Sequence, residues 1–271
     1  RNIQTLTLRL ENSIPLLHSF GEREREKMSG AECCENPPTL SPRCGAGHIK
    51  EIGGLDCYVS GPPGCSLAII LVSDIFGYEA PNLRKLADKL AAGGFCVVVP
   101  DFLHGDPFQP GNPERPIQEW LKNHSPDNAA EEAKTIIDSL KRRAVSKIAA
   151  VGFCWGAKVV VELAKPDYLQ AAVVCHPSFV TVDDIRDVRV PIAILGAELD
   201  SISPPALLRQ FEEILNGNPE VDGFVKIFPN ASHGWTVRYN SEGPEAVKAA
   251  EEAHQDILNW AVKYLKPETL K

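Results

Sequence analysis

Apolar and polar residues alternate along the chain in blocks that predict strands and helices in turn. Short uninterrupted apolar runs at 67–73, 95–100 and 171–175 have the length of strands buried on both faces. Between such runs, apolar residues recur every three or four positions, as in the segment that opens at Pro81 and stops at Gly93-Gly94. Alternating strands and helices indicate an α/β fold with a mostly parallel central sheet and helices on both faces.

The same two patterns predict the remaining elements. We expect further strands and helices in this order: a strand pair at 48–60 that turns at Gly53-Gly54, a short helix near 114–122, a helix capped by Ser125-Pro126, strands at 147–151 and 190–195, a helix capped by Ser203-Pro204, a strand at 223–228 and a final helix at 243–265. Ligands of such sheets bind beyond the carboxyl ends of the strands. Residues that directly follow a strand are therefore the candidates for chemistry.

The chain divides into one domain and two preceding segments. Its 271 residues suit a single large α/β domain, which we place at 48–268. Residues 28–47 are rich in Pro, Gly and Cys and are predicted to form an irregular arm. Residues 1–27 lack the apolar segment of a secretory signal, and we interpret them as a non-native or disordered extension ahead of a start at Met28. A truncated targeting segment is the alternative; on the first interpretation, their removal leaves stability and activity unchanged.

Charge and cysteine usage narrow the classes of partner and compartment. With 28 Lys+Arg against 36 Asp+Glu, the formal net charge of −8 argues against binding to nucleic acid or to an anionic membrane surface. No run approaches the roughly 18 apolar residues of a membrane-spanning helix. The 8 cysteines are scattered, which favours reduced thiols in a cytoplasmic protein over a disulfide scaffold. We expect a small-molecule substrate, and the sequence leaves monomer and dimer open.

The segment Gly152-Phe153-Cys154-Trp155-Gly156 carries the strongest chemical signal. It follows a predicted strand and precedes a helix, which is the context of the G-x-S-x-G nucleophile elbow, here with Cys in place of Ser. The turn would lift the sulfur of Cys154 above the sheet to a helix N-terminus, where the helix dipole favours a thiolate. The alternative is a small buried cysteine in a tight turn.

A cysteine nucleophile needs a base and an orienting acid, and both follow later in the chain. Asp200 comes just after the strand at 190–195, and His233 just after the strand at 223–228. The order nucleophile, acid, histidine is that of α/β-hydrolases. Glu198 is the rival acid in the same loop.

Taken together, these segments resemble the dienelactone hydrolase family, also called carboxymethylenebutenolidases, and within it the plant members. The resemblance covers about residues 46–268 and rests on the Cys154 elbow, the Asp200 loop, Ser232-His233-Gly234 and Asp74-Ile75-Phe76-Gly77. It implies the α/β-hydrolase fold. It also implies that the Asp74 carboxylate holds the resting thiol, although the family commonly has Glu there, one methylene longer. The backbone N–H groups of Ile75 and Trp155 would form the oxyanion hole.

Other residues are candidates for lining the substrate pocket. They are aromatic, cationic or imidazole side chains near the predicted catalytic loops: Phe76, Tyr78, Trp235, Arg238 and His176. Core packing is an equal alternative for the aromatic residues, and a solvated position is an equal alternative for Arg238, which the resemblance places near a substrate carboxylate.

No metal or cofactor is expected. Cys175-His176 is a poor metal pair because adjacent residues point apart, and the cysteines at 33, 34 and 44 lack a completing pair for a zinc knuckle.

The sequence thus predicts a hydrolase that cleaves an ester or lactone through an acyl-cysteine. Cys154 attacks, His233 moves the protons and Asp200 orients His233. Three rivals remain: a β-glucan endohydrolase, as some plant relatives are labelled; a non-catalytic small-molecule receptor on a hydrolase scaffold; and a thiol redox sensor. Glycosidases generally need two carboxylates flanking the scissile bond, which a Cys-His-Asp site does not supply.

Overall fold

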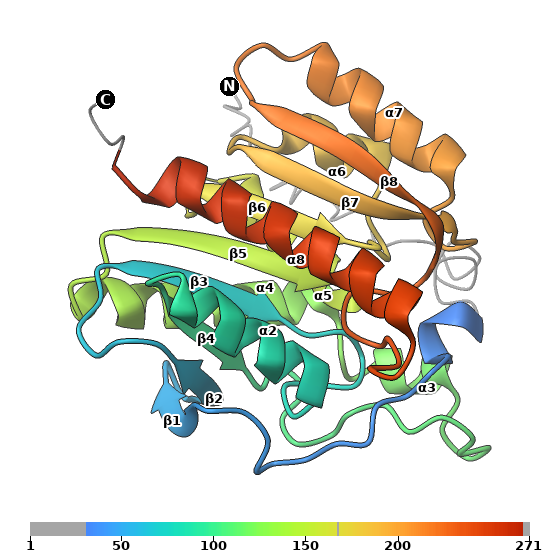
Figure 1. Ribbon diagram of the computed structural model, residues 1–271, viewed down its shortest axis with the longest axis horizontal. Helices are drawn as coiled ribbons and strands as arrows, with labels where there is room; N and C mark the ends of the chain where they lie inside the picture. Colours follow the sequence, from blue (N-terminus) through green and yellow to red (C-terminus); the bar gives the residue numbers. More distant parts are fainter. Residues whose placement is uncertain (1–30, 167, 268–271) are drawn as a thin grey trace, which may run out of the picture.

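The computed structural model describes residues 31–166 and 168–267, so the expectations for residues 1–27 and Met28 lie outside it. Its centre is an 8-stranded sheet of order β1-β2-β4-β3-β5-β6-β7-β8 (Figure 1). The strands are β1 (His48–Ile52), β2 (Leu55–Ser60), β3 (Leu67–Val72), β4 (Cys96–Pro100), β5 (Lys147–Phe153), β6 (Ala171–Cys175), β7 (Ile192–Leu199) and β8 (Gly223–Ser232). The β1–β2 and β2–β4 pairings are antiparallel and the others are parallel. The predicted α/β fold with a mostly parallel sheet is confirmed.

The apolar runs form strands because both faces of the sheet are covered. In β3, Ala68, Ile70 and Val72 pack into the core on one face, while Ile69 and Leu71 pack into the core on the other. Successive side chains of a strand point to opposite faces, so a strand between two cores must be apolar at every position.

Helices form a layer on each face of the sheet. α2 (Pro81–Ala92) and α8 (Pro244–Leu265) cover one face. The opposite core contains residues of α3 (Ile117–Leu121), α4 (Pro126–Arg142), α5 (Trp155–Ala164), α6 (Val182–Asp187) and α7 (Pro205–Asn216). α4 begins as predicted, because the Ser125 hydroxyl accepts a hydrogen bond from the Asp127 N–H and Pro126 takes the first helical position.

Three local predictions need correction. β7 and β8 extend to Leu199 and Ser232, each four residues beyond the predicted end. Ser203 does not cap α7: Pro204 occupies that position, and the Ser203 hydroxyl donates to Asp200 Oδ2 at 3.0 Å. α6 was not predicted, although its Thr181 and Asp184 form a reciprocal capping box that a search for T-x-x-D would have found.

The expectation that all cysteines are reduced is wrong for one pair. A disulfide joins Cys65 to Cys96, with their Cα atoms 5.9 Å apart. The cause is the parallel pairing of β3 with β4, whose register sets Ala68 opposite Cys96 and so brings the residues just before β3 alongside. The other six described cysteines are free thiols.

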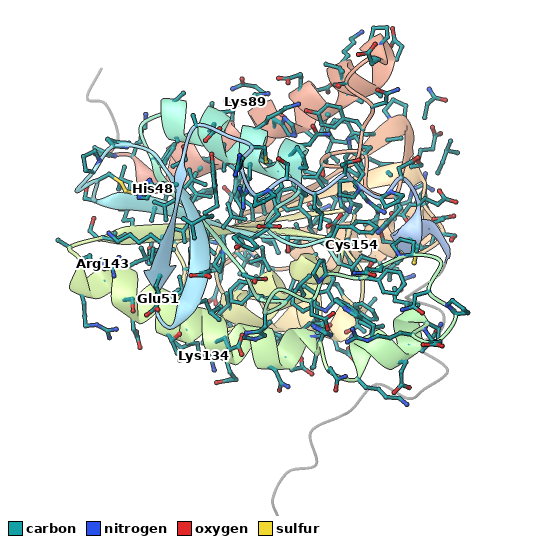
Figure 2. All side chains as sticks on the ribbon, turned by 90° about the horizontal axis from the view of Figure 1, so that it is seen from below. His48, Glu51, Lys89, Lys134, Arg143 and Cys154 are labelled. Atoms are coloured by element: carbon teal, nitrogen blue, oxygen red, sulfur yellow. A yellow bond between two sulfur atoms is a disulfide. The ribbon has the colours of Figure 1, made fainter. Side chains whose placement is uncertain are left out.

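The arm ahead of the sheet contains a short 3₁₀ helix, η1 (Ala31–Cys34). In Figure 2, η1 lies beside Cys154, whereas Arg143, which precedes β5, lies at the far end of that strand. The arm therefore reaches the carboxyl edge of the parallel strands. Within residues 31–166 and 168–267, no helix is both long enough and apolar enough to cross a membrane.

Candidate active site

The loop after β5 is a sharp elbow, as predicted. Cys154 has φ 51° and ψ −111°, and α5 starts at the next residue. A Cβ at Gly152 would lie 2.3 Å from the carbonyl oxygen of Gly156, and one at Gly156 would lie 2.3 Å from that of Val72. Only glycine permits these close approaches, while the nucleophile candidate itself accepts a strained positive φ.

The loops after β7 and β8 bring the predicted acid and base together. His233 Nδ1 lies 2.9 Å from Asp200 Oδ2. Asp200 Oδ1 accepts hydrogen bonds from the N–H groups of Ile202 at 2.9 Å and Ser203 at 3.1 Å. Asp200 is thus held by its own loop and in turn fixes one ring nitrogen of His233. Glu198, the rival acid, is exposed and accepts instead from the Asn230 N–H.

The Cys154 thiol and the His233 imidazole lie in one buried cluster. The Cys154 sulfur and a His233 ring nitrogen lie within 4.8 Å of each other. Burial alone would raise the pKa of the Cys154 thiol, but the hydrogen bond from Cys33 and the charge on His233 outweigh it, and this pKa falls well below its ordinary value. Burial opposes a charged His233, yet the Cys154 thiolate and Asp200 raise its pKa to about 9. The pair therefore favours a thiolate beside an imidazolium.

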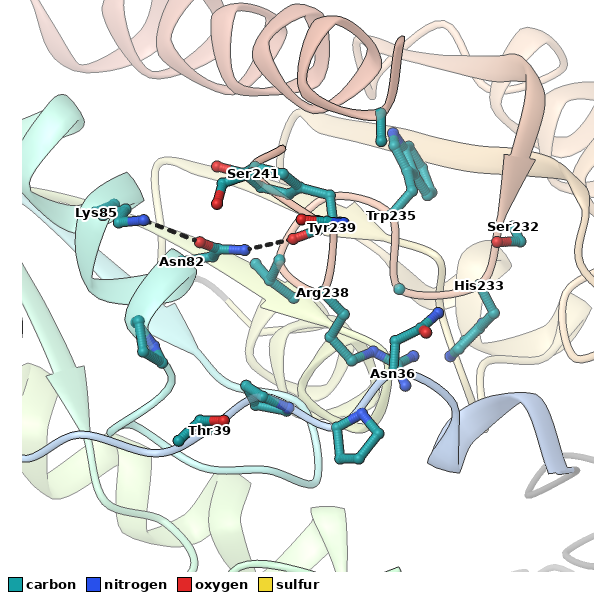
Figure 3. Close-up of a pocket in the computed structure, with 17 residues that line it drawn as sticks. Asn36, Thr39, Asn82, Lys85, Ser232, His233, Trp235, Arg238, Tyr239 and Ser241 are labelled. Atoms are coloured by element: carbon teal, nitrogen blue, oxygen red, sulfur yellow. Dashed lines mark hydrogen bonds between the residues drawn. The ribbon is translucent and has the colours of Figure 1, made fainter. Parts of the chain in front are cut away.

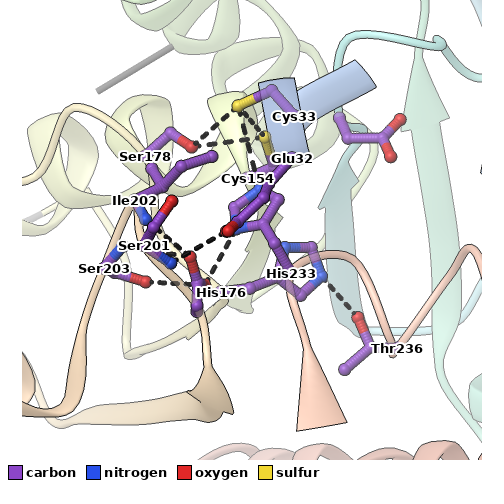
Figure 4. Close-up of polar contacts among 12 residues, drawn as sticks. Glu32, Cys33, Cys154, His176, Ser178, Ser201, Ile202, Ser203, His233 and Thr236 are labelled. Carbon is purple, nitrogen blue, oxygen red and sulfur yellow. Dashed lines mark hydrogen bonds and ion pairs between the residues drawn. The ribbon is translucent and has the colours of Figure 1, made fainter. Parts of the chain in front are cut away.

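A residue of the arm, Cys33, covers this site, although we expected no functional role for it. Cys33 Sγ lies 3.7 Å from Cys154 Sγ and 3.9 Å from His233 Nε2 (Figure 4). Ser178, just past β6, lies 3.3 Å from the Cys154 sulfur and 3.6 Å from that of Cys33. Cys154 is 0% exposed and Cys33 1%. No spacing rule links residue 33 to the elbow, so neither Cys33 nor Ser178 had a sequence signal.

Arg238 holds the arm against the site by hydrogen bonds to the arm backbone. Its Nη1 donates to the carbonyl oxygens of Cys33 at 2.8 Å and Glu35 at 2.7 Å. Arg238 is buried, so the solvated alternative is wrong. Its Nη2 has no hydrogen-bond partner among the described residues.

Asp74 faces Arg238. Its Oδ1 accepts from the Phe76 N–H at 3.0 Å, and its Oδ2 lies 3.4 Å from Arg238 Nε. Burial raises the pKa of the Asp74 carboxyl to about 6, although Arg238 opposes the rise. In the part of the chain that the structure describes, the Cys154 thiol makes its contacts with Cys33 and Ser178 rather than a hydrogen bond with Asp74. The thiol-holding role of Asp74 stays a prediction.

The role of Trp155 and Ile75 as oxyanion-hole donors stays a prediction, and the structure gives the backbone position of each. Trp155 is the first residue of α5, where a backbone N–H has no partner within the helix. Ile75 lies in a turn that the Asp74 carbonyl closes by accepting the Gly77 N–H at 3.1 Å.

A pocket of about 630 Å³ opens beside the site (Figure 3). His233, Trp235 and Arg238 line it, together with the arm at Asn36 to Thr39, but Cys154 does not. A cavity of about 230 Å³ lies next to Phe76 and Tyr78.

His176 lines neither of these two cavities. It lies behind the site with its Nε2 2.8 Å from Thr236 Oγ1 and its ring 5.0 Å from that of His233. Burial holds the pKa of His176 well below its ordinary value, so it is neutral.

Comparison with known proteins identifies the scaffold. Residues 55–265 match the model of the dienelactone hydrolase family. The chain belongs to the dienelactone hydrolase family. It is 34% identical to a carboxymethylenebutenolidase homolog of Xenopus tropicalis over 81% of this chain and 91% of that protein. It is 43% identical to a maize protein named endo-1,3;1,4-beta-D-glucanase over 70% of this chain, but that match spans only 64% of the maize protein.

A solved structure of a putative dienelactone hydrolase from Klebsiella pneumoniae supports the same fold, with a TM-score of 0.65 and 22% identity over 78% of this chain and 93% of that one. The protein is therefore a hydrolase of the dienelactone hydrolase family. The family match begins at β2, so it includes Cys154, Asp200 and His233 but not η1. Cys33, which covers Cys154, lies outside the matched part of the chain.

Proposed function

We propose that the protein hydrolyses a carboxylic ester or lactone through an acyl-cysteine intermediate on Cys154. One observation carries the proposal: a thiol at a strained elbow, with its pKa lowered, lies beside a histidine whose other nitrogen is fixed by a buried carboxylate. This is the arrangement that nucleophilic acyl transfer requires.

The reaction follows from that geometry in two steps. The Cys154 thiolate attacks the carbonyl carbon, and the backbone N–H groups of Ile75 and Trp155 stabilise the oxyanion. The C–O bond breaks as His233 gives its proton to the leaving alkoxide, which forms a thioester. Water then attacks the thioester while His233 accepts its proton, and the carboxylic acid leaves as the thiolate re-forms.

The surroundings favour a substrate with an anionic group. Two Arg238 nitrogens, Nε and Nη2, have no hydrogen-bond partner among the described residues, and Arg238 lines the pocket next to His233. A carboxylate on the substrate would satisfy these donors. Because Cys33 covers Cys154 at 3.7 Å, the substrate carbonyl reaches the sulfur only after the arm withdraws.

The name of the maize relative raises a second candidate, hydrolysis of mixed-linkage glucan. The site argues against it, because its two buried carboxylates already have other partners. Asp200 holds His233, and Asp74 accepts from the Phe76 backbone while facing Arg238. General acid and base catalysis at a glycosidic bond generally needs two carboxyl groups free to face the sugar. Reducing-sugar release from mixed-linkage glucan tests this candidate directly.

A substrate screen with matched cysteine variants tests the proposal. Purified protein is assayed against lactones, aryl esters and dienelactones, with and without a carboxylate. Cys154→Ala is expected to abolish turnover, and Cys154→Ser to retain a small part, since serine can use the same base but ionises less easily. Cys34→Ala, which removes a half-buried thiol from the arm, is the control and keeps turnover. Equal hydrolysis by Cys154→Ala and the parent would overturn the proposal, and stoichiometric retention of ligand without turnover would indicate a receptor.

A further inference from the structure

We propose that Cys33, Cys154, His233 and Ser178 form a binding site for one zinc ion, which joins the arm to the catalytic residues. Cys33 has no role in the proposed hydrolysis, yet its side chain is as buried as that of the nucleophile. Two thiols and an imidazole are the ligands that zinc prefers in proteins, and two sulfurs with one nitrogen leave the fourth position of a tetrahedron open.

Four of the six distances among the donor atoms are close to the edges of a zinc tetrahedron. With Zn–S bonds of about 2.3 Å, tetrahedral geometry sets two sulfurs about 3.8 Å apart and a sulfur about 3.5 Å from a nitrogen or oxygen ligand. The Cys33 and Cys154 sulfurs are 3.7 Å apart. Ser178 Oγ lies 3.3 Å and 3.6 Å from these sulfurs, and His233 Nε2 lies 3.9 Å from that of Cys33. The Cys154 and His233 donor atoms lie within 4.8 Å of each other, so a cation at the centre of this cluster would draw these two side chains closer together.

The histidine is already oriented for a metal. His233 Nδ1 lies 2.9 Å from Asp200, which leaves Nε2 directed at the sulfurs. A carboxylate behind a ligating histidine fixes its ring and raises its basicity, as in many zinc sites.

Charge and access are also compatible with a cation. Once His233 gives up its proton to bind a metal, Arg238 is the positive side chain left near the two sulfurs, and Asp74 lies 3.4 Å from its Nε. Two thiolates with Asp74 and Asp200 carry four negative charges against one on Arg238, so a divalent ion leaves the cluster near neutrality. His233 borders the pocket of about 630 Å³, which gives an entry path once the arm shifts.

Zinc bound at this site would inhibit ester hydrolysis, a consequence that rests on the proposed function. The metal would take the Cys154 electron pair that attacks the substrate and the His233 nitrogen that moves the proton. It would also clamp the arm over the pocket through Cys33. Removal of the metal by a chelator would restore both groups.

The experiment compares two neighbouring thiols of the arm. Full-length protein is reduced with a phosphine, stripped with EDTA and desalted, and its zinc affinity is measured by competition with a chromophoric chelator. The parent and Cys34→Ser are expected to bind one equivalent of zinc with the same affinity. Cys33→Ser is expected to lose at least about 100-fold in affinity, because even an outer-shell partner contributes about 10–100-fold. Cobalt-loaded parent is expected to show tetrahedral ligand-field bands and a thiolate-to-cobalt absorption that weakens in Cys33→Ser.

Zinc binding and the inhibition of ester hydrolysis by zinc are measured separately. In each variant, the ratio of ester hydrolysis with and without zinc is expected to track zinc affinity. Equal zinc affinity of the parent and Cys33→Ser overturns the site, as does an equal loss in Cys34→Ser or a parent that binds no zinc. If no variant hydrolyses any ester, the proposed function fails, while the chelator titration and cobalt spectrum still decide the zinc site.

Discussion

Replacing Asp74 by Asn is expected to make the protein more stable at neutral pH. The Asp74 carboxyl is fully buried, and its pKa rises from 3.8 to about 6 in the folded state. A carboxyl that is harder to ionise when folded destabilises the fold once it is charged. That cost is absent below pH 3.8, grows as the pH rises to about 6, and stays constant above it.

The size of the effect follows from the shift of about two units. At about 1.4 kcal/mol per unit, ionised Asp74 costs about 3 kcal/mol at pH 7 and well under 1 kcal/mol at pH 4. Asn has the same shape without the charge. The free energy of unfolding of Asp74→Asn, relative to that of the parent, is therefore expected to rise by about 2 kcal/mol between pH 4 and pH 7.

Urea unfolding of both proteins at the two pH values measures this difference. Changes in packing or hydrogen bonding on substitution are present at both pH values and cancel in the comparison, as do the titrations of other groups. Asp138→Asn, which removes an exposed carboxylate from α4, is the control and is expected to show no such pH-dependent gain. A constant difference between Asp74→Asn and the parent, or one that falls with pH, would refute the argument that burial dominates at Asp74.

Four further outcomes are expected. Asp74→Asn lowers turnover or alters the pH–rate profile while the protein stays folded, and Asp74→Glu, which has the length common in the family, shows whether the carboxylate position matters. Asp200→Asn lowers ester turnover by roughly three to four orders of magnitude, because His233 loses the acceptor that orients it. Gly156→Ala lowers the free energy of unfolding by at least about 2 kcal/mol in urea titration, because its Cβ would lie 2.3 Å from the Val72 carbonyl oxygen. Arg238→Gln speeds hydrogen exchange at residues 32–35 and alkylation of Cys154, because the hydrogen bonds from Nη1 to the carbonyl oxygens of Glu32, Cys33 and Glu35 are lost.

The fold and the proximity of Cys154, His233 and Asp200 could be predicted because their signals are local. A fully apolar strand such as β3 indicates a strand covered on both faces. The glycines at 152 and 156 indicate a turn too tight for a side chain at either position. Asp200 and His233 were found by their order along the chain and by their positions after strands. The ends of parallel strands meet at one edge, so position after a strand is already information about space.

Predictions failed where a side-chain contact that the pattern does not show decides the outcome. Ser203 has the sequence of a helix cap, but a buried Asp200 nearby offers its hydroxyl a stronger acceptor. Arg238 appeared equally suited to solvent because nothing in the sequence shows that the arm supplies carbonyl oxygens for it. The Cys65–Cys96 pairing likewise depends on the register of β3 and β4, which no spacing reveals.

The arm separates two properties of Cys154 that usually vary together. Cysteine reactivity ordinarily follows thiolate character and exposure in parallel. Here the hydrogen bond from Cys33 and the charge on His233 lower the pKa of the thiol, while Cys33 and Arg238 also keep it 0% exposed. Labelling of the free protein therefore reports how often the arm opens, not how easily Cys154 ionises. A slow reaction with iodoacetamide would be consistent with a strongly nucleophilic sulfur. Arg238→Gln loosens the arm but also removes a positive charge that lowers the pKa of Cys154. Faster labelling of this variant would therefore come from access to the sulfur and not from easier ionisation.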